Sequence, residues 1–208
     1  SHLLDDEWAM VRDSGSNVSY APQIELQMGH GWAQAVTARD YGVPIGLSSD
    51  VATTASSDQF TQMHAIFASE RARRYEIAWD ENLEWNEPES KLITSRDVLA
   101  MATIGGAKVA GIADRTGSLT PGKKADLVII DTKAVNVAPV IDPVGAVVCA
   151  ADISNVRTVM VDGQILKDDF RLKADLAQPR KLVEESRDYL VSKFGAPEPG
   201  WLPTAVTA

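Results

Sequence analysis

The sequence predicts an α/β protein in which parallel βα units are followed by a small β-sheet or sandwich. Three observations predict this class: strand-like and helix-like segments alternate over residues 17–75, short β segments follow one another beyond Leu119, and an amphipathic helix lies near the end. Alternating strands and helices are typical of parallel βα units, whereas runs of short strands form a separate sheet. We expect three parts, residues 1–118, 119–174 and 175–208.

The first part begins with a short helix in "DDEWAMVRDSG", because acidic residues in a first turn suit the helix dipole and Gly15 is a typical C-terminal stop. A strand at residues 17–22 is ended by Pro22. A helix at residues 31–42 closes at Gly42, and "VPIGLSS" follows as a second strand. The next helix carries an apolar stripe with helical periodicity. The stripe consists of Phe60, Met63, Ile66 and Phe67.

The rest of the chain changes from helices to short β segments. Residues 77–93 are acidic and contain tryptophan, which indicates an inserted loop or a short helix. Ser95 is the expected N-cap of a helix that runs to the region of Gly111. After it, "TPGKKADLVIID" is a turn and a buried strand, "VGAVVCAA" is another β segment, and "VRTVMVDGQIL" is a hairpin turning at Asp162 and Gly163. The segment "QPRKLVEESRDYLVSKFG" is an amphipathic helix, and a Pro-rich extended tail follows.

The composition excludes several classes of function. The 208 residues are 45% apolar and 24% charged, which are ordinary values for a globular protein. A net charge of −9 argues against nucleic-acid binding, which needs clustered Lys and Arg. The nearest basic cluster, Arg71, Arg73 and Arg74 beside Glu70, is expected to be a solvated helix face. The single cysteine, Cys149, excludes an internal disulfide and is expected to be a small buried hydrophobe.

No targeting or membrane segment is visible in the sequence. No apolar run approaches the length of about 20 residues that spans a bilayer, and the chain begins directly on "SHLLDDEW". We therefore expect no membrane partner and a cytoplasmic protein. The missing initial Met leaves a tag remnant, an internal cleavage or a truncated chain as explanations.

One long segment carries a family resemblance. The run "SRDVLAMATIGGAKVAGIADRTGSLTPGKKADLVIID" resembles the segment that closes the barrel in the amidohydrolase superfamily, most strongly in its cytosine-deaminase-like and chlorohydrolase-like branch. "VRTVMVDGQIL" is similar to the family's strand pair with "V-x-x-V-x-V-x-G". "APQIELQMGHG" and "VPIGLSSDV" are similar to its seventh and eighth barrel strands. The resemblance reaches to about residue 170, and its most specific part is the Pro-Gly-Lys-x-Ala-Asp-Leu run.

The resemblance implies the C-terminal βα units of a (β/α)8 TIM barrel plus part of an accessory β-sandwich, and it implies a role for Asp50. In this superfamily an aspartate that ends the eighth strand binds a divalent metal and shuttles a proton from the attacking water. An acid at that position points into the barrel mouth, where TIM-barrel active sites lie. A metal-bound carboxylate can accept the proton of an activated water. The alternative is that Asp50 is the N-cap of the helix beginning near Ser57.

The family's other metal ligands are a His-x-His pair on the first strand and a histidine on the fifth, and a histidine on the sixth strand polarises the substrate. This chain has only His2, His30 and His64. His2 is either the catalytic histidine of the sixth strand or a loop or tag residue. His30 either reaches the substrate cleft or caps the next helix, and His64 is expected to be a satisfied core histidine. Glu25 stands where deaminases often carry Asn, and it is either a substrate contact or a solvated acid.

A full barrel takes about 250 residues, so the expected function is that of the C-terminal part of a metal-dependent amidohydrolase. The intact enzyme would hydrolyse a C–N or C–Cl bond of a small heterocyclic molecule, with Asp50 as metal ligand and proton shuttle. The expected metal is zinc, or alternatively iron or manganese, with further ligands outside this chain. The expected partners are the missing N-terminal part of the barrel or a second copy of the chain. The alternative function is a non-catalytic fragment, a pseudoenzyme or interaction module without the histidine ligands.

Overall fold

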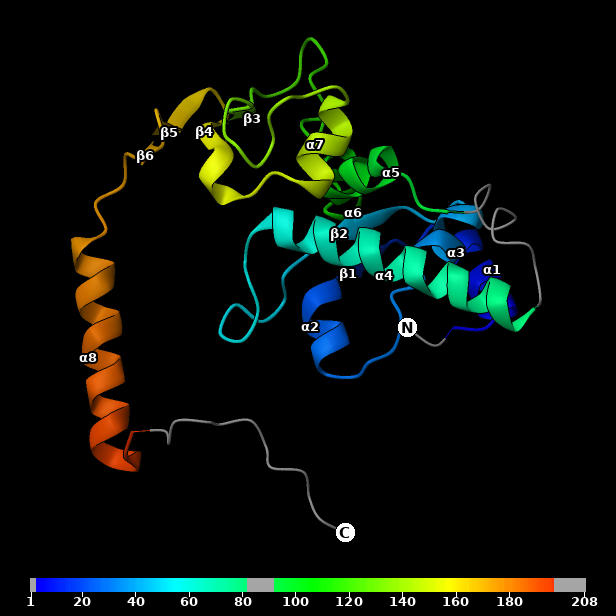
Figure 1. The fold of residues 1–208 in the computed structure, drawn as a ribbon, viewed down its shortest axis with the longest axis horizontal. Helices are drawn as coiled ribbons and strands as arrows, with labels where there is room; N and C mark the ends of the chain where they lie inside the picture. Colours follow the sequence, from blue (N-terminus) through cyan, green and yellow to red (C-terminus); the bar gives the residue numbers. More distant parts are fainter. Residues whose placement is uncertain (1–2, 82–91, 197–208) are drawn as a thin grey trace. The chain divides into compact units, whose positions relative to one another are not determined.

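The computed structural model describes residues 3–81 and 92–196 of the chain (Figure 1). The chain divides into two compact units, residues 1–172 and residues 173–208. The first unit contains every described strand and all of the described helices but one. Within the described residues, the second unit is built around that one long helix. The predicted Pro-rich tail falls at residues 197–208, outside the described residues, as does most of the predicted insertion at 77–93.

Two short parallel strands lie at the centre of the first unit (Figure 1). Strand β1 is Val18–Tyr20 and strand β2 is Ile45–Leu47, and their register pairs the first residue of each and the last residue of each. Every residue of β2 is buried. The parallel pairing confirms the predicted βα arrangement. Because parallel strands end at the same edge of a sheet, the segments after Tyr20 and Leu47 start side by side.

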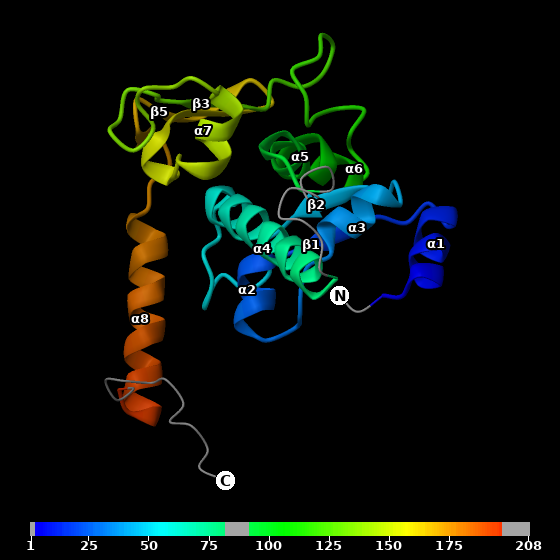
Figure 2. The same ribbon diagram turned by 45° about the vertical axis from the view of Figure 1, so that its right-hand side comes forward.

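Helices cover this strand pair. Helix α4 lies across the strands, and η2 and α6 pack against β2 (Figure 1, Figure 2). A core of buried apolar side chains joins these elements, among them Trp8, Val36, Ile66 and Val98. The helices of this part are α1 (Asp5–Asp13), α2 (Pro22–Gln27), α3 (Ala35–Asp40), α4 (Gln59–Asp80), α5 (Ser95–Ala100), the π-helical turn η2 (Met101–Gly105) and α6 (Gly106–Val109).

Several predicted helix ends differ from the observed ones. The helix expected at residues 31–42 begins only at Ala35, because residue Gln34 before it is in the left-handed region. The expected N-cap Ser95 is the first residue of α5, and the N-cap is Thr94. Thr94 Oγ1 accepts a hydrogen bond from the Asp97 N–H at 3.1 Å, and the Asp97 carboxylate accepts one from the Thr94 N–H at 2.9 Å. This reciprocal capping box fixes the start of α5 one residue earlier than predicted.

Glycines allow the helix that follows α5 to approach β2 closely. A Cβ atom on Gly105 would lie 2.1 Å from the carbonyl oxygen of Ile45, far inside any contact that a real Cβ makes. A Cβ atom on Gly46 would lie 3.0 Å from the Cα of Gly106. The first glycine of the "GG" in the resembling segment, Gly105, is therefore required by the packing, because side chains at Gly46 and Gly105 would push the helix off the strand.

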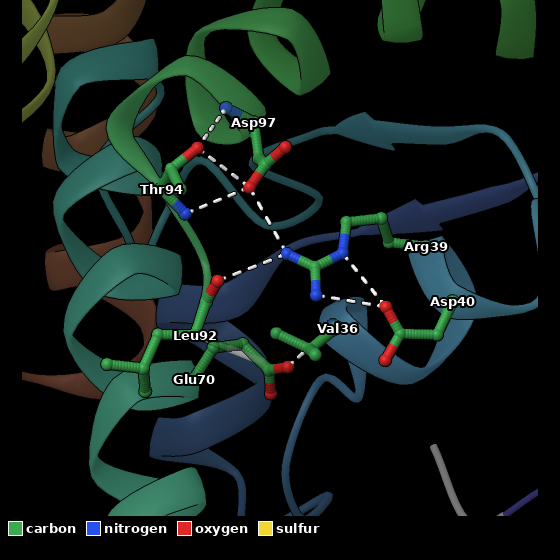
Figure 3. Close-up of polar contacts among 7 residues, drawn as sticks. All are labelled: Val36, Arg39, Asp40, Glu70, Leu92, Thr94 and Asp97. Carbon is green, nitrogen blue, oxygen red and sulfur yellow. Dashed lines mark hydrogen bonds and ion pairs between the residues drawn. The ribbon is translucent and has the colours of Figure 1, made fainter. Parts of the chain in front are cut away.

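Arg39 at the end of α3 fastens α3 to the start of α5 (Figure 3). Its Nη1 donates to the Leu92 carbonyl at 3.1 Å and to Asp97 Oδ2 at 3.2 Å, and its Nε and Nη2 donate to Asp40 Oδ1. Partial burial favours the neutral form of Asp97, but the hydrogen bonds from Thr94 and then the charge of Arg39 outweigh it, so the pKa of Asp97 is lowered. The ion pair of Arg39 and Asp97 therefore connects α3 to α5, two helices that are far apart in the sequence.

The expected solvated face around Glu70 is wrong. Glu70 is fully buried, and its Oε2 accepts a hydrogen bond from the Val36 N–H at 2.7 Å, which satisfies a donor in the first turn of α3 (Figure 3). Its Oε1 lies 3.8 Å from Nη1 of Arg73, whose side chain is only 15% exposed. Arg71 and Arg74 are also partly buried. Glu70, and with it Arg73, is thus part of the packing between α3 and α4.

A second, antiparallel sheet follows in the order β3-β4-β5-β6. The predicted hairpin is confirmed, since β4 and β5 flank the turn at Asp162 and Gly163. The predicted burial of β3 is wrong, because Val128 and Ile129 are 53% and 48% exposed. The strands are β3 (Leu127–Ile130), β4 (Val156–Val161), β5 (Gln164–Asp168) and β6 (Arg171–Leu172).

The segment "VGAVVCAA" is a helix and not the predicted β segment. Helix α7 spans Pro143–Cys149. Asp142 is its N-cap and accepts a hydrogen bond from the Val144 N–H at 3.0 Å, and proline occupies the first helical position. An Asp-Pro start is a helix signal that outweighs the β preference of three valines. Cys149 is exposed at the end of this helix, so the expected burial of its side chain is wrong. A short 3-10 turn, η3 (Ile153–Asn155), leads into β4.

The "TPGKKADL" run joins the helical part to this sheet through side chains. Lys123 Nζ donates to the carbonyls of Ala113 and Thr116. Asp126 accepts from the Thr116 hydroxyl at 2.6 Å and from the Asp162 N–H, also at 2.6 Å. These bonds, first that from Thr116, lower the pKa of Asp126. Lys123 therefore binds the segment that follows α6, and Asp126 connects this segment to the β4–β5 turn.

The second unit contains the predicted C-terminal helix. Helix α8 spans Ala177–Phe194, and Gly195 follows it with a φ of 80°. None of its described residues is buried. The predicted apolar face is made of the exposed side chains Leu182, Val183, Leu190 and Phe194.

Candidate functional site at the strand ends

Asp50 lies at the carboxyl-terminal edge of the parallel strands. It follows the end of β2 by three residues, and its side chain is exposed. Its φ is 53°, in the left-handed region that aspartate tolerates better than most residues. Its carboxylate makes no hydrogen bond or ion pair with any residue that the structure describes. A carboxylate at a strand end that has no partner among the described residues is available to a ligand.

The helix-cap alternative for Asp50 is wrong, because the N-cap of α4 is Asp58. Asp58 Oδ1 accepts a hydrogen bond from the Thr61 N–H at 2.9 Å, and its Oδ2 accepts from the hydroxyls of Thr61 and Ser56. Partial burial favours the neutral form, but the bonds from Ser56 and then Thr61 outweigh it and lower the pKa of Asp58. Asp58 lies eight positions after Asp50 in the chain, so the cap does not account for Asp50.

Glu25 lies in the first turn of α2, on the segment that follows β1. Its Oε1 accepts a hydrogen bond from the Ala21 N–H at 2.8 Å, so one carboxylate oxygen stabilises the helix start. Glu25 is partly buried, and its predicted contact with a substrate stays a prediction.

His30 is exposed just after α2, and its N–H donates to the Glu25 carbonyl at 2.9 Å. The residue that caps the next helix, α3, is Gln34 and not His30. The helix-cap alternative for His30 is therefore wrong. Its predicted place in a substrate cleft stays a prediction.

The two remaining histidines are His2 and His64. His2 lies outside the described residues. His64, on α4, is only partly buried, and its Nε2 is buried without a hydrogen-bond partner among the described residues. The expectation of a satisfied core histidine is therefore wrong.

The described part of the chain does not hold a complete metal site. Over residues 3–81 and 92–196, no group of three or more His, Cys, Asp and Glu side chains could hold a metal ion. Asp50 offers one carboxylate, a ligand of the kind that zinc accepts beside histidine nitrogens. Among the same residues, no helix is both long and apolar enough to cross a membrane.

The sequence matches known proteins along most of its length. Residues 1–166 match the profile of the amidohydrolase family. A 5-methylthioadenosine/S-adenosylhomocysteine deaminase of Acetivibrio thermocellus is 32% identical over 173 residues, which are 83% of this chain and 37% of that protein. A 5'-deoxyadenosine deaminase of Methanosarcina mazei is 32% identical over 186 residues, 89% of this chain and 39% of that protein. The chain thus spans about two-fifths of the length of these relatives.

Solved structures show the same likeness. An adenosine deaminase of Xanthomonas campestris with bound zinc superposes with a TM-score of 0.74 at 23% identity, over 92% of this chain and 41% of that one. An atrazine chlorohydrolase of Arthrobacter aurescens complexed with zinc has a TM-score of 0.71 at 26% identity, over 89% of this chain and 38% of that one. These neighbours imply a TIM-barrel type of α/β fold.

Proposed function

The chain belongs to the amidohydrolase family, as its sequence predicted, and we propose that it is the C-terminal part of a metal-dependent hydrolase. The proposed reaction is hydrolysis of a C–N bond of a small heterocyclic molecule. The observation that carries the proposal is the position of Asp50: its carboxylate has no partner among the described residues, and it lies three residues after a buried strand, at the edge where the parallel strands end. In TIM barrels this edge is the catalytic one.

In this proposal Asp50 is a metal ligand and the proton carrier. A bound zinc ion would supply Lewis acidity that lowers the pKa of a water molecule toward neutrality. The Asp50 carboxylate would accept the proton of the attacking water at one oxygen and deliver it to the leaving amine. No other described side chain competes for this carboxylate, which leaves both oxygens available.

The other metal ligands are proposed to lie outside this chain. Zinc sites with a hydrolytic role need about three protein ligands and one open position, and the described residues provide no cluster of that size. The similarity to zinc-containing structures, one of them 26% identical, supports zinc as the metal. A preceding part of the barrel is the proposed source of the histidines, and a second copy of the chain is the other possible source.

The substrate is proposed to be an adenine nucleoside, with deamination as the reaction. Support comes from the relatives at 32% identity, which are named as deaminases of 5-methylthioadenosine, S-adenosylhomocysteine and 5'-deoxyadenosine. Glu25 and His30 are proposed to contact this substrate, because both lie on the segment after β1. In the same proposal, residues 1–118 are barrel, residues 119–174 belong to an accessory sandwich, and residues 175–208 are a terminal extension.

Ammonia release by the zinc-loaded, full-length protein tests this function. We expect release from 5'-methylthioadenosine or 5'-deoxyadenosine, and its loss in Asp50→Asn. Glu76→Gln, which removes an exposed acid from α4, is the matched control and should retain the activity. Chloride release from a chlorinated triazine in place of ammonia release would keep the hydrolase but replace its substrate. A zinc-loaded protein without either activity would favour the non-catalytic alternative.

A further inference from the structure

The loop that carries Asp50 is attached at both ends. This loop, residues 48–58, joins β2 to α4. At its start, the Ser48 N–H donates to the carbonyl of Tyr20, the last residue of β1, at 2.7 Å. Asp50 itself makes no hydrogen bond with the described residues. The position of Asp50 therefore depends on how the two ends of the loop are held.

A pair of glutamines holds the far end of the loop. The Ser56 N–H donates to Gln23 Oε1 at 2.9 Å, and the Ser56 carbonyl accepts from Gln62 Nε2, also at 2.9 Å. The two side chains meet as well, since Gln62 Nε2 lies 3.4 Å from Gln23 Oε1. Gln62 Oε1 accepts from the backbone N–H of Gln23 at 3.3 Å. The backbone N–H and the backbone carbonyl of Ser56 are thus both hydrogen-bonded to glutamine side chains.

Gln62 is suited to this position by its chemistry. It lies on α4 and is 0% exposed. A buried amide is stable only when its donors and acceptor are used, and here the side chain donates to one backbone carbonyl and accepts from one backbone N–H. The N–H that it binds belongs to the first turn of α2, where a helix leaves its donors unpaired. An apolar side chain or a carboxylate at this position would leave at least one of these groups unsatisfied.

We propose that Gln62 and Gln23 are positioning residues for Asp50. They attach the loop after β2 to the first turn of α2, which also carries Glu25. The attachment would keep the distance between Asp50 and Glu25, the acids that follow the two neighbouring strands, constant. The inference rests on the proposed function of Asp50 as a metal ligand. A loop released from this attachment keeps its carboxylate but loses the geometry that metal binding requires.

Gln62→Glu tests the proposal, because it preserves shape and removes the donor to the Ser56 carbonyl. Gln59→Glu is the matched control: it places the same charge on an exposed position of the same helix. Hydrogen exchange of residues 48–58 and the zinc dissociation constant of the full-length protein are the two readouts. In Gln62→Glu we expect exchange in the loop to rise about tenfold with protection of β1 and β2 unchanged. The zinc dissociation constant should rise about tenfold or more.

The possible outcomes separate this inference from the proposed function. Equal zinc affinity in the two variants would overturn the positioning role, even if the loop exchanges faster. A wild-type protein without zinc affinity would refute the proposed function and, with it, the positioning of a metal ligand. If Gln62→Glu fails to fold, Gln23→Ala decides. Gln23→Ala removes the side-chain oxygen that accepts from the Ser56 N–H, at a partly exposed position. The zinc dissociation constant must rise in this variant too if the positioning role holds.

Discussion

Gly105→Ala should destabilise the protein although alanine favours helices. Gly105 has helical backbone angles, so the substitution gains about 1 kcal/mol of helix propensity. The new Cβ, however, would lie 2.1 Å from the Ile45 carbonyl oxygen and 2.9 Å from that of Ala100. The strand would have to retreat by about 1 Å to restore a 3.0 Å contact. Overpacking costs about 1–3 kcal/mol, and we expect the upper end because backbone must move. After the gain in helix propensity, the net loss is about 2 kcal/mol.

Gly106→Ala is the matched control one residue further on. Its Cβ would lie 3.6 Å from the Met101 carbonyl oxygen, an ordinary contact. We expect a gain of about 0.4–1 kcal/mol from the reduced entropy of the unfolded chain. Urea denaturation followed by circular dichroism measures both free energies of unfolding. A Gly105→Ala variant as stable as Gly106→Ala would refute the close packing of this helix on β2.

Two further predictions concern aspartates with lowered pKa values. Asp126→Asn should be less stable than the wild type at neutral pH. Because the folded pKa of Asp126 lies below its usual value, the wild type's advantage is complete above pH about 3.9 and shrinks as the pH falls through the lowered pKa. Urea titrations at pH 7 and pH 3 check this, and an equal difference at both would contradict it. Asp58→Ala should cost about 1 kcal/mol as a lost cap. Asp50→Asn should stay within about 0.5 kcal/mol of the wild type. In thermal unfolding, Asp58→Ala should therefore have a lower melting temperature than Asp50→Asn.

Short sequence patterns predict those strands and turns whose ends are marked by residues within the same segment. The strand before Pro22, the strand before Asp50 and the hairpin at Asp162 and Gly163 all follow from alternation, proline and turn residues. The prediction of a β segment in place of α7 rests on its β-branched residues, which favour strands. The Asp142 cap and the proline that begins the helix favour a helix. That signal was present in the sequence.

Other features depend on contacts between distant segments. The sequence leaves the cap alternatives for Asp50 and His30 open, and only the structure identifies Asp58 as the N-cap of α4 and Gln34 as the N-cap of α3. Burial of Glu70 arises from α3 packing over α4, which a charge count cannot foresee. Gln62 was not recognised, because a lone glutamine beside an apolar stripe gives no indication of the partner that it binds across 39 residues.

Zinc content of the full-length protein, measured for wild type and Asp50→Asn, tests whether Asp50 is a metal ligand. We predict stoichiometric zinc in the wild type and in the control Glu76→Gln. Asp50→Asn should bind zinc at least about tenfold more weakly while remaining folded, since even a residue that only supports a metal ligand contributes that much affinity. Equal zinc affinity in Asp50→Asn and wild type would contradict the role of Asp50 as a metal ligand.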